Sequence, residues 1–355
     1  MAFMIKVGVT GANGFIGRSI SSRLTEVEGF EVEEIKLPVN RLLDCDVVLH
    51  CAGINRPKEN ETFQLNVEMT DNLISFVSSG CHLIMMSSTQ VLRTNPYGLS
   101  KLGAEELVKT LNRWSIFRLP NIFGAGCKPH YNSVVATFCK QAVLREPHKI
   151  DNPDHVLQLL WIEHLVDFSV NLISEPPKQN QIITFDEIAE ELSVQQLSEL
   201  ILEIYQDLSS GFVRSLEGSL RWQLETTLLS YFEEPLIRLL KPIKDDRGLF
   251  CELLKTNNGQ ISFLKCDIGE ERGLHYHRAK YERFFVLSGN GLFRSKHING
   301  SITDVNLQSG EVVEVATIPY HVHSVKNVGE NELVVLIWAN EIFNHKKPDT
   351  FKGSI

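Results

Sequence analysis

The sequence lacks any apolar run approaching the about 18 residues that a membrane-spanning helix needs. Its seven cysteines include no Cys-x-x-Cys pair, and their odd number fits reduced thiols better than a disulfide framework. Basic residues are not in excess, because the formal net charge is −9, which argues against a general attraction to nucleic acid or to an anionic membrane. The segment Met1–Thr10 is too short and too strand-like for a signal peptide. We therefore expect a cytoplasmic protein without nucleic-acid or membrane partners.

What is present is typical of a globular protein: 355 residues, 43% hydrophobic and 22% charged. This length predicts two domains with separate cores. The pattern changes near Leu239, because strand and helix patterns alternate before it and short β-rich runs follow it. We expect a first domain over residues 1–238 and a second over residues 239–355.

The first domain opens with a strand that leads into a glycine-rich loop. Its glycines follow the spacing Gly-x-x-Gly-x-x-Gly, which is the variant found in short-chain dehydrogenases. Such a loop lets the backbone approach a pyrophosphate held by amides at the next helix N-terminus. The alternative is a loop whose glycines serve packing only. The predicted cofactor contacts in this loop are Gly11, Asn13, Gly14, Phe15, Ile16 and Gly17.

Two further strands add candidate cofactor contacts. The strand Phe30–Ile35 ends where such folds bind the adenosine ribose. Lys36 follows with no acidic residue close behind it, which favours NADP over NAD; the alternative is a solvated lysine on a surface loop. The near-continuous apolar run Asp46–Gly53 predicts a strand buried on both faces of a parallel sheet. It ends in Ala52 and Gly53, where a cofactor can lie close to the backbone.

A candidate proton donor follows the buried strand His82–Ser88. Tyr97 and Lys101 lie four residues apart and therefore share a face of a helix. We expect the Lys101 ammonium to lower the pKa of the Tyr97 phenol below its ordinary value of roughly 10 and make it a usable acid or base. Ser88 at the strand end is expected to hydrogen-bond a substrate carbonyl. The alternative is an ordinary surface pair on a helix.

The glycine loop, Ser88 and Tyr97-x-x-x-Lys101 together resemble the extended short-chain dehydrogenase/reductase family. The resemblance implies a doubly wound, parallel α/β sheet of the Rossmann type, with Ser88, Tyr97 and Lys101 as the catalytic triad and with Tyr97 and Lys101 also touching the cofactor. It further implies a substrate-side turn at Arg118–Gly124. The candidate substrate contacts on this turn and in the next loop are Asn121, Lys128, His130 and Asn132. The alternative for the loop is a connection without ligand contacts.

The second domain combines β-rich runs with clustered histidines. Asn-Gly and Ser-Gly turns separate the runs, which predicts a sandwich or a small barrel. His275 and His277 are two apart on a strand and share a face. Glu282 has the wrong parity for that face, so we expect a bulge or turn at Arg278–Tyr281. The runs are Leu249–Leu254, Ile261–Cys266, Arg283–Leu287, Gly291–Lys296, Ile302–Leu307, Val312–Val315 and Leu333–Trp338.

Three imidazoles and one carboxylate suit a divalent metal such as zinc, and we expect the ligands to be His275, His277, Glu282 and His323. Any one of these histidines alone is more often a core or surface residue than a ligand. Their joint spacing matches the first motif of the cupin family and part of the second, in which the usual Pro-x-Gly is absent. The resemblance implies an all-β cupin barrel. The matching segments are Gly269-x5-His275-x-His277-x4-Glu282-x6-Gly289 and Pro319-x3-His323-x3-Asn327.

A short-chain reductase followed by a cupin is an uncommon order. Over nearly its whole length the chain resembles the bifunctional UDP-2-acetamido-2,6-dideoxy-hexos-4-ulose reductases of the CapF/WbjC type, from capsule and O-antigen synthesis. The segments that carry this resemblance are Ala52–Lys58, Arg118–Asn121, Cys127–Ser133, Asp245–Gly248 and Pro348–Thr350.

The resemblance implies two steps on one UDP-sugar. A metal in the cupin would polarise the C4 ketone for epimerisation at C3. NADPH would then reduce C4, with Tyr97 protonating the oxygen, Lys101 tuning Tyr97 and holding the ribose, and Ser88 orienting the carbonyl. The expected product is UDP-2-acetamido-2,6-dideoxy-L-talose, a precursor of UDP-N-acetyl-L-fucosamine, made by a homodimer.

Two alternatives stay open at this point. One is a nucleotide-sugar 4-epimerase or dehydratase with a merely structural cupin. A dehydratase of this superfamily carries Asp-Glu after the triad hydroxyl, whereas Thr89 and Gln90 stand here. The other is a non-catalytic scaffold, against which the intact Ser88, Tyr97 and Lys101 argue.

Overall fold

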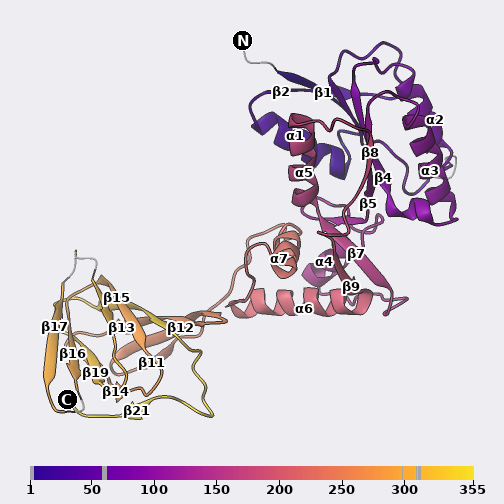
Figure 1. The fold of residues 1–355 in the computed structure, drawn as a ribbon. Helices are drawn as coiled ribbons and strands as arrows, with labels where there is room; N and C mark the ends of the chain where they lie inside the picture. Colours follow the sequence, from indigo (N-terminus) through magenta and orange to yellow (C-terminus); the bar gives the residue numbers. More distant parts are fainter. Residues whose placement is uncertain (1–3, 58–61, 298, 309, 311–312) are drawn as a thin grey trace. The chain divides into compact units, whose positions relative to one another are not determined.

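The structure is a computed structural model that describes residues 4–57, 62–297, 299–308, 310 and 313–355 (Figure 1). Lys58 and Val312, which belong to segments singled out above, lie outside these residues. The chain divides into two compact units, Met1–Tyr205 with Leu216–Glu234, and Gln206–Ser215 with Pro235–Ile355. Residues 206–215 precede the expected boundary at 238 and belong to the second unit.

The first unit is built on a six-stranded sheet with the order β2-β1-β3-β4-β5-β8, in which all neighbours are parallel. Strands β3 and β4 are buried at every residue, because a parallel sheet is covered on both faces. The doubly wound parallel sheet that the sequence predicts is therefore confirmed. The strands are β1 (Ile5–Thr10), β2 (Phe30–Ile35), β3 (Val47–His50), β4 (His82–Ser88), β5 (Trp114–Leu119) and β8 (Gln181–Thr184).

Helices cover both faces of this sheet (Figure 1). Successive side chains of a strand point to opposite faces, so Leu49 packs in the core beneath α1 and α5 while Val48 packs beneath α2 and α3. The crossover from β2 to β3 contains no helix, as its short length requires. The covering helices are α1 (Phe15–Glu26), α2 (Leu65–Ile74), α3 (Pro96–Val108) and α5 (Ile162–Ser174).

A smaller three-stranded sheet with the order β6-β7-β9 completes the first unit. Its strands β6 and β7 are parallel, and β7 and β9 are antiparallel. The remaining elements are β6 (Asn121–Phe123), β7 (Val156–Trp161), β9 (Glu190–Ser193), the short 3-10 helix η1 (Thr89–Leu92), and the helices α4 (Val134–Leu144) and α7 (Leu220–Leu229). Helix α6 (Val194–Ser210) begins in the first unit, and its last residues, 206–210, belong to the second.

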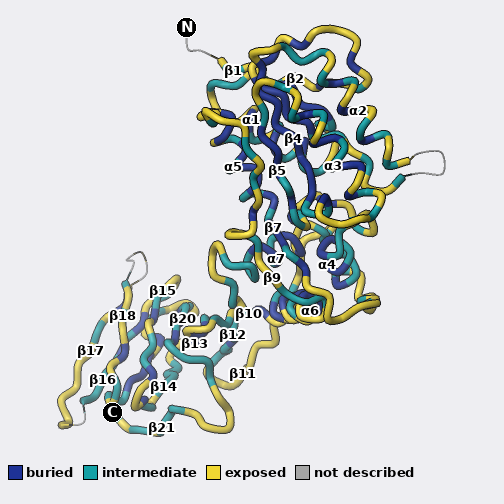
Figure 2. The backbone as a smooth tube through the Cα atoms, turned by 45° about the vertical axis from the view of Figure 1, so that its right-hand side comes forward, coloured by how far each residue is buried: buried dark blue, intermediate teal, exposed yellow. Residues whose placement is uncertain are grey.

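The second unit consists of two β-sheets whose strands are antiparallel, apart from the short parallel pair β10–β12. One sheet has the order β10-β12-β13-β20-β15-β18, with β11 also on β12, and the other has the order β17-β16-β19-β14-β21. Phe284 and Val335 of the first sheet share a core with Phe293 and Val325 of the second. Figure 2 shows buried residues recurring along these strands.

The β-rich character expected after Gly248 is confirmed, and the runs predicted at 291–296 and 302–307 coincide with strands. The strands of this unit are β10 (Phe212–Val213), β11 (Ile243–Asp245), β12 (Gly248–Thr256), β13 (Gly259–Cys266), β14 (Glu271–Tyr276), β15 (Glu282–Ser288), β16 (Gly291–Lys296), β17 (Ile302–Leu307), β18 (Glu314–Ala316), β19 (Val322–Asn327), β20 (Leu333–Ala339) and β21 (Phe351–Lys352).

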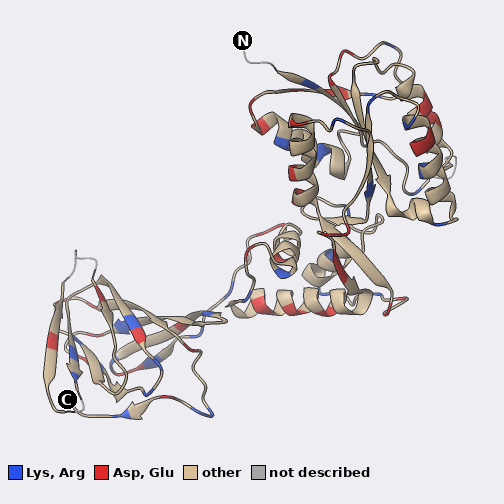
Figure 3. Cartoon of the chain, in the orientation of Figure 1, with Lys and Arg blue, Asp and Glu red and all other residues tan. Residues whose placement is uncertain are grey.

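Charged residues of both signs are interspersed along the described elements of both units (Figure 3). Among the described residues, no helix combines the length and the apolar character that a membrane span requires.

Candidate functional site

The glycine loop lies between β1 and α1, and its packing leaves no room for a side chain at two of its glycines. Gly11 has a φ of +65°, and a Cβ there would lie 2.7 Å from the backbone nitrogen of Ala52. A Cβ on Gly17 would lie 2.3 Å from the carbonyl oxygen of Gly11, so only glycine fits at both positions. Gly14 offers no side chain to cap α1, and the first turn of α1 carries no acidic residue. The first amides of α1 are therefore available to an anion.

The end of β2 approaches this loop through a residue that the sequence analysis did not weigh. The Asn13 side-chain amide donates a 2.8 Å hydrogen bond to the Glu34 carboxylate. Glu34 is the last residue but one of β2, and exposed Lys36 follows the strand. An acid at the end of β2 binds a ribose 2′-hydroxyl, whereas a cation accommodates a 2′-phosphate. An acidic and a basic side chain thus both occur at this strand end. Glu34 could have been identified from the sequence, because it lies near the end of the predicted strand.

The three predicted catalytic side chains meet at the carboxyl end of β4. Ser88 ends this strand and hydrogen-bonds the Tyr97 phenol. Tyr97 and Lys101 both lie on α3, where residues one turn apart share a face. The Lys101 ammonium is fully buried and donates a 3.0 Å hydrogen bond to the Met86 carbonyl oxygen. Gly53 lies against Lys101, because a Cβ on Gly53 would be 3.0 Å from its Nζ atom.

The pKa of Tyr97 differs from the sequence prediction. Burial raises the Tyr97 pKa to about 12, against the lowering effect of the Ser88 hydrogen bond. The expectation that Lys101 lowers this pKa is wrong here, because the desolvation of the phenol dominates and the ammonium is directed at Met86. Burial also lowers the pKa of Lys101 to about 8.

Asn66 of α2 is a buried polar residue of this site that the sequence analysis did not single out. Its side-chain oxygen accepts a 2.7 Å hydrogen bond from the Ile54 backbone N–H, and its amide donates to the Ser100 hydroxyl at 3.1 Å. It thereby fixes the segment after β3 against α3. Thr70 lies one turn later and bonds buried His50. Polar residues at this helical spacing, facing a buried strand, are the signal that would have found them.

A buried ion pair supports the same strand ends. Glu105 lies one turn after Lys101 on α3 and is fully buried. Its carboxylate accepts hydrogen bonds from the Ser87 hydroxyl at 2.6 Å and from the Arg118 guanidinium at 3.2 and 2.7 Å. Glu105 therefore joins α3 to β4 and β5 directly behind the catalytic side chains.

Two predicted substrate contacts are exposed. Asn121 lies on β6, and its side-chain amide donates a 3.1 Å hydrogen bond to the Gln158 carbonyl oxygen on β7. This bond ties the Asn121 amide to the small sheet. The Lys128 ammonium lies 5.7 Å from the centre of the Tyr131 ring.

The other two predicted substrate contacts join two loops. His130 and Asn132 have left-handed backbones with φ of 58° and 57°, a conformation that non-glycine residues adopt at a cost. Asn132 donates a 2.9 Å hydrogen bond to the Asn55 carbonyl oxygen, and Arg56 donates a 3.1 Å bond to the His130 carbonyl oxygen. The segments 52–57 and 127–133, which carried the family resemblance separately, are therefore neighbours.

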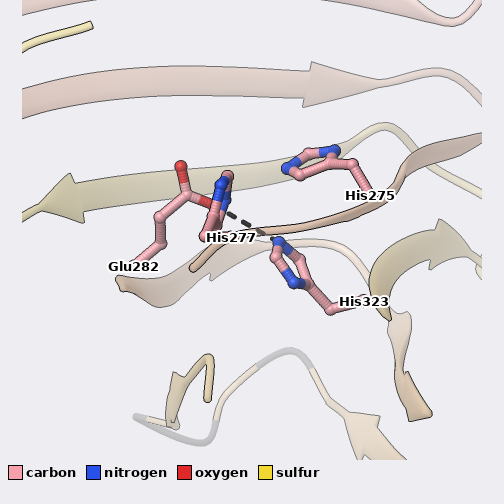
Figure 4. A group of neighbouring side chains, drawn as sticks. All are labelled: His275, His277, Glu282 and His323. Carbon is pink, nitrogen blue, oxygen red and sulfur yellow. Dashed lines mark ion pairs between the residues drawn. The ribbon is translucent and has the colours of Figure 1, made fainter. Parts of the chain in front are cut away.

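In the second unit, the four predicted metal ligands converge. One nitrogen or oxygen atom from each of His275, His277, Glu282 and His323 lies within 4.8 Å of every other (Figure 4). His275 pairs with His323 across β14 and β19, and Glu282 begins β15. The chain leaves β14 after Tyr276, so 277–281 form the turn that the parity of Glu282 required.

The chemistry of this cluster fits a divalent cation. The Nε2 atoms of His277 and His323 are buried and, within the described structure, have no hydrogen-bond partner. They lie 3.4 and 3.5 Å from one Glu282 oxygen, which is ion-pair range without hydrogen-bond geometry. A buried unpaired polar atom costs about 1–3 kcal/mol, and a bound ion would remove that cost.

The protonation states also suit a cation. Burial lowers the pKa of His275 to about 4, so its imidazole is neutral and can donate a lone pair. Burial acting alone would raise the pKa of Glu282, but His277, His323 and Lys280 hold this pKa well below its usual range. Glu282 is therefore a carboxylate at neutral pH.

Comparison with known proteins matches both units. The NAD dependent epimerase/dehydratase family matches residues 7–183, and the Polysaccharide biosynthesis C-terminal domain matches residues 243–351. A UDP-glucuronic acid 4-epimerase from Bacillus cereus, with NAD bound, covers 64% of this chain and 98% of its own at 18% identity and a TM-score of 0.52. At that identity it shows the fold of the first unit alone.

Two proteins match along the whole chain. The capsular polysaccharide assembling protein CapF from Staphylococcus aureus has 28% identity and a TM-score of 0.85, with 99% of this chain and 100% of that chain covered. The UDP-2-acetamido-2,6-beta-L-arabino-hexul-4-ose reductase of Pseudomonas aeruginosa is 35% identical over 99% of both chains. The chain therefore belongs to the CapF-type family of UDP-2-acetamido-2,6-dideoxy-hexos-4-ulose reductases.

Proposed function

We propose that this protein is a bifunctional UDP-sugar enzyme of surface-polysaccharide synthesis. Its second unit, a cupin barrel, inverts C3 of a UDP-2-acetamido-2,6-dideoxy-hexos-4-ulose, and its first unit reduces the C4 ketone with NADPH. The product is UDP-2-acetamido-2,6-dideoxy-L-talose, which leads to UDP-N-acetyl-L-fucosamine. The observation that carries the proposal is the His275, His277, Glu282 and His323 cluster in a chain 35% identical, end to end, to a 4-keto-sugar reductase.

In the second unit, the four clustered side chains would hold a divalent metal, with zinc favoured by the three imidazoles. A metal held there would supply Lewis acidity at the C4 carbonyl oxygen, so that the C3 proton could be lost to a base and returned to C3 from the opposite face. The neutral imidazole of His275 and the anionic Glu282 are already in the protonation states that such a site needs.

In the first unit, Ser88 donates a hydrogen bond to the C4 carbonyl oxygen and fixes the face of the ketone. NADPH held in this unit would supply the hydride that C4 accepts. The Tyr97 phenol gives its proton to the C4 oxygen, so that the ketone becomes an alcohol, and solvent restores the phenol. A pKa of about 12 keeps Tyr97 protonated at neutral pH, which suits a proton donor.

In this proposal, residues 11–17 would hold the pyrophosphate of the cofactor, and Lys101 would hold its nicotinamide ribose. Ala52 and Gly53 would lie beside the cofactor, since they approach Gly11 and Lys101 closely. Lys36 is assigned to the 2′-phosphate of NADPH. The UDP-sugar contacts Asn121, Lys128, His130 and Asn132.

We place the reaction in the cytoplasm, because all seven cysteines are unpaired, as expected in a reducing compartment. We also propose a homodimer, whose presence is measurable by light scattering of the purified chain.

The test is to identify the products from the keto-sugar by NMR, with and without NADPH. Solvent deuterium should enter C3 without NADPH, and the C3-inverted alcohol should form with it, at one NADPH oxidised per product. Reduction without any exchange at C3 would contradict the proposed epimerase activity. Exchange without reduction would contradict the proposed reductase activity.

A further inference from the structure

Asp349 lies in the C-terminal segment, between β20 and β21, and clamps the turn that joins two of the clustered side chains. Its two carboxylate oxygens accept hydrogen bonds from three consecutive backbone N–H groups, those of Arg278 (3.0 and 3.1 Å), Ala279 (2.8 Å) and Lys280 (2.8 Å). This turn carries the chain from His277 to Glu282. A single carboxylate therefore fixes the backbone between these two residues.

The main chain of Asp349 also orients His277. The Nδ1 atom of His277 hydrogen-bonds the Asp349 carbonyl oxygen. A carbonyl oxygen only accepts hydrogen bonds, so Nδ1 carries the proton of this bond and Nε2 is the nitrogen that remains to face a ligand. That Nε2 atom is the one buried without a partner beside Glu282. Such a carbonyl–histidine contact is how metal proteins aim an imidazole.

Asp349 also affects Glu282, through Lys280. The Lys280 backbone is held by Asp349, and its buried ammonium lies 3.1 Å from one Glu282 oxygen. The other Glu282 oxygen is then left facing His277 and His323. One oxygen is thus occupied by the lysine, and the other is free for a ligand.

The segment continues into β21, which pairs with β14, the strand of His275. Lys352 lies opposite His275, and the Gly353 N–H donates to the Leu274 carbonyl oxygen at 2.9 Å. Leu274 has a φ of +57° at a register shift between Gly273 and His275, where an added backbone partner offsets the cost of that conformation. The C-terminal segment therefore contacts the surroundings of three of the four clustered side chains.

We propose that Asp349 is a positioning residue for the metal site, and that it sets metal affinity through the 278–280 turn and His277 without being a ligand. This inference rests on the metal site proposed above. Loss of an outer partner of this kind weakens metal binding about 10–100-fold.

The test measures zinc affinity of the full-length protein by competition with a chromophoric chelator. Asp349→Ala should bind zinc about 10–100-fold more weakly than the wild type. Asp349→Asn keeps one acceptor oxygen and should lie between the two. Asp304→Ala is the matched control, since it removes a carboxylate that accepts two hydrogen bonds from Arg294 in the same unit, and it should keep wild-type affinity.

The outcomes separate this inference from the metal site itself. Wild-type zinc affinity in folded Asp349→Ala, judged by circular dichroism and NADPH oxidation, would overturn the role of Asp349 and leave the metal site standing. A wild-type chain that binds no divalent metal would overturn both. If Asp349→Ala does not fold, Asp349→Asn decides: affinity equal to that of the wild type contradicts the proposal, and weaker affinity supports it.

Discussion

The two candidate sites differ in how their buried polar groups find hydrogen-bond partners. In the first, the buried polar groups of the candidate site satisfy one another: Lys101 bonds the Met86 carbonyl, Asn66 bonds Ile54, and Glu105 bonds Arg118. In the second, two buried imidazole nitrogens of the described chain have no hydrogen-bond partner.

The difference shows what each site needs to be complete. A satisfied network holds its geometry without a ligand, because no desolvated group is left unpaired. Unpaired buried nitrogens around a carboxylate carry a free-energy cost that a bound cation would remove. We therefore expect the first unit to be stable on its own and the second to depend on metal, and each prediction below tests one side of this contrast.

The largest effect is expected from Tyr97→Phe, which removes the proton donor and keeps the ring. Reduction of the keto-sugar should slow by about 10²–10⁴-fold, the usual contribution of a general acid. The rate of NADPH oxidation, followed by absorbance, measures this loss. Zinc affinity should not change, since Tyr97 belongs to the first unit. Reduction at the wild-type rate would remove Tyr97 from the chemistry.

Glu105→Ala breaks the satisfied network of the first unit. It leaves Arg118 without its buried partner, and breaking a buried pair costs about 3–5 kcal/mol of unfolding free energy. Chemical denaturation of the first unit gives this number. Glu106→Ala is the control on the same helix, because its pair with Lys109 is exposed and is worth about 0–1 kcal/mol. Equal losses in the two variants would argue against a supporting network.

Metal should stabilise the second unit selectively. At a metal concentration 100 times the dissociation constant, binding adds roughly 2.7 kcal/mol to unfolding. Calorimetry with and without a chelator should show one transition that shifts and one, from the first unit, that stays in place. If a chelator shifts neither transition, the expectation that the second unit depends on metal is wrong.

The rate of reduction should fall at alkaline pH because Lys101, which is proposed to hold the nicotinamide ribose, loses its charge. Its pKa is lowered by burial from 10.5 to about 8. Lys101 is therefore protonated at lower pH, and it loses its proton as the pH rises through this value. Above it, kcat/KM should drop by about tenfold per pH unit. Tyr97, with a pKa of about 12, remains protonated over this range. A profile flat to pH 10 would contradict the assignment.

The same pKa shift affects stability with the opposite sign. Between about pH 8 and 10.5 the unfolded chain binds more protons at Lys101 than the folded chain. The contribution of this residue to the unfolding free energy therefore increases with pH in that window.

The smallest effect is expected at the cofactor's 2′-phosphate. Lys36→Ala should raise the KM for NADPH by up to about fivefold, as an exposed cation contributes at most about 1 kcal/mol, and should leave the KM for NADH unchanged. Glu34→Ala is the informative partner variant, because it removes the acid that bonds Asn13. If Glu34→Ala weakens NADH and Lys36→Ala leaves NADPH unaffected, the enzyme uses NAD.

Local patterns were sufficient to predict much of this molecule. The strands β2 and β4 and the spacing of the glycines follow from apolar runs and turn residues alone. Strand parity predicts that His275 and His277 share a face. The match to the cupin motifs adds Glu282 and His323, and the four side chains converge.

Other features depend on packing that no local pattern encodes. The pKa of Tyr97 follows from burial by distant elements, so the spacing predicts the pair with Lys101 but not the desolvation of the phenol. Asp349 contacts His277 from 72 residues away.

The most direct test of two separate active sites is deuterium incorporation at C3 by two variants, followed by NMR in heavy water. Tyr97→Phe should exchange the C3 proton of the keto-sugar but not reduce it. His275→Ala should lose the exchange and still oxidise NADPH when given the C3-inverted ketone. If either variant abolished both reactions while remaining folded, the two chemistries would share one site and the division of labour between the units would be wrong.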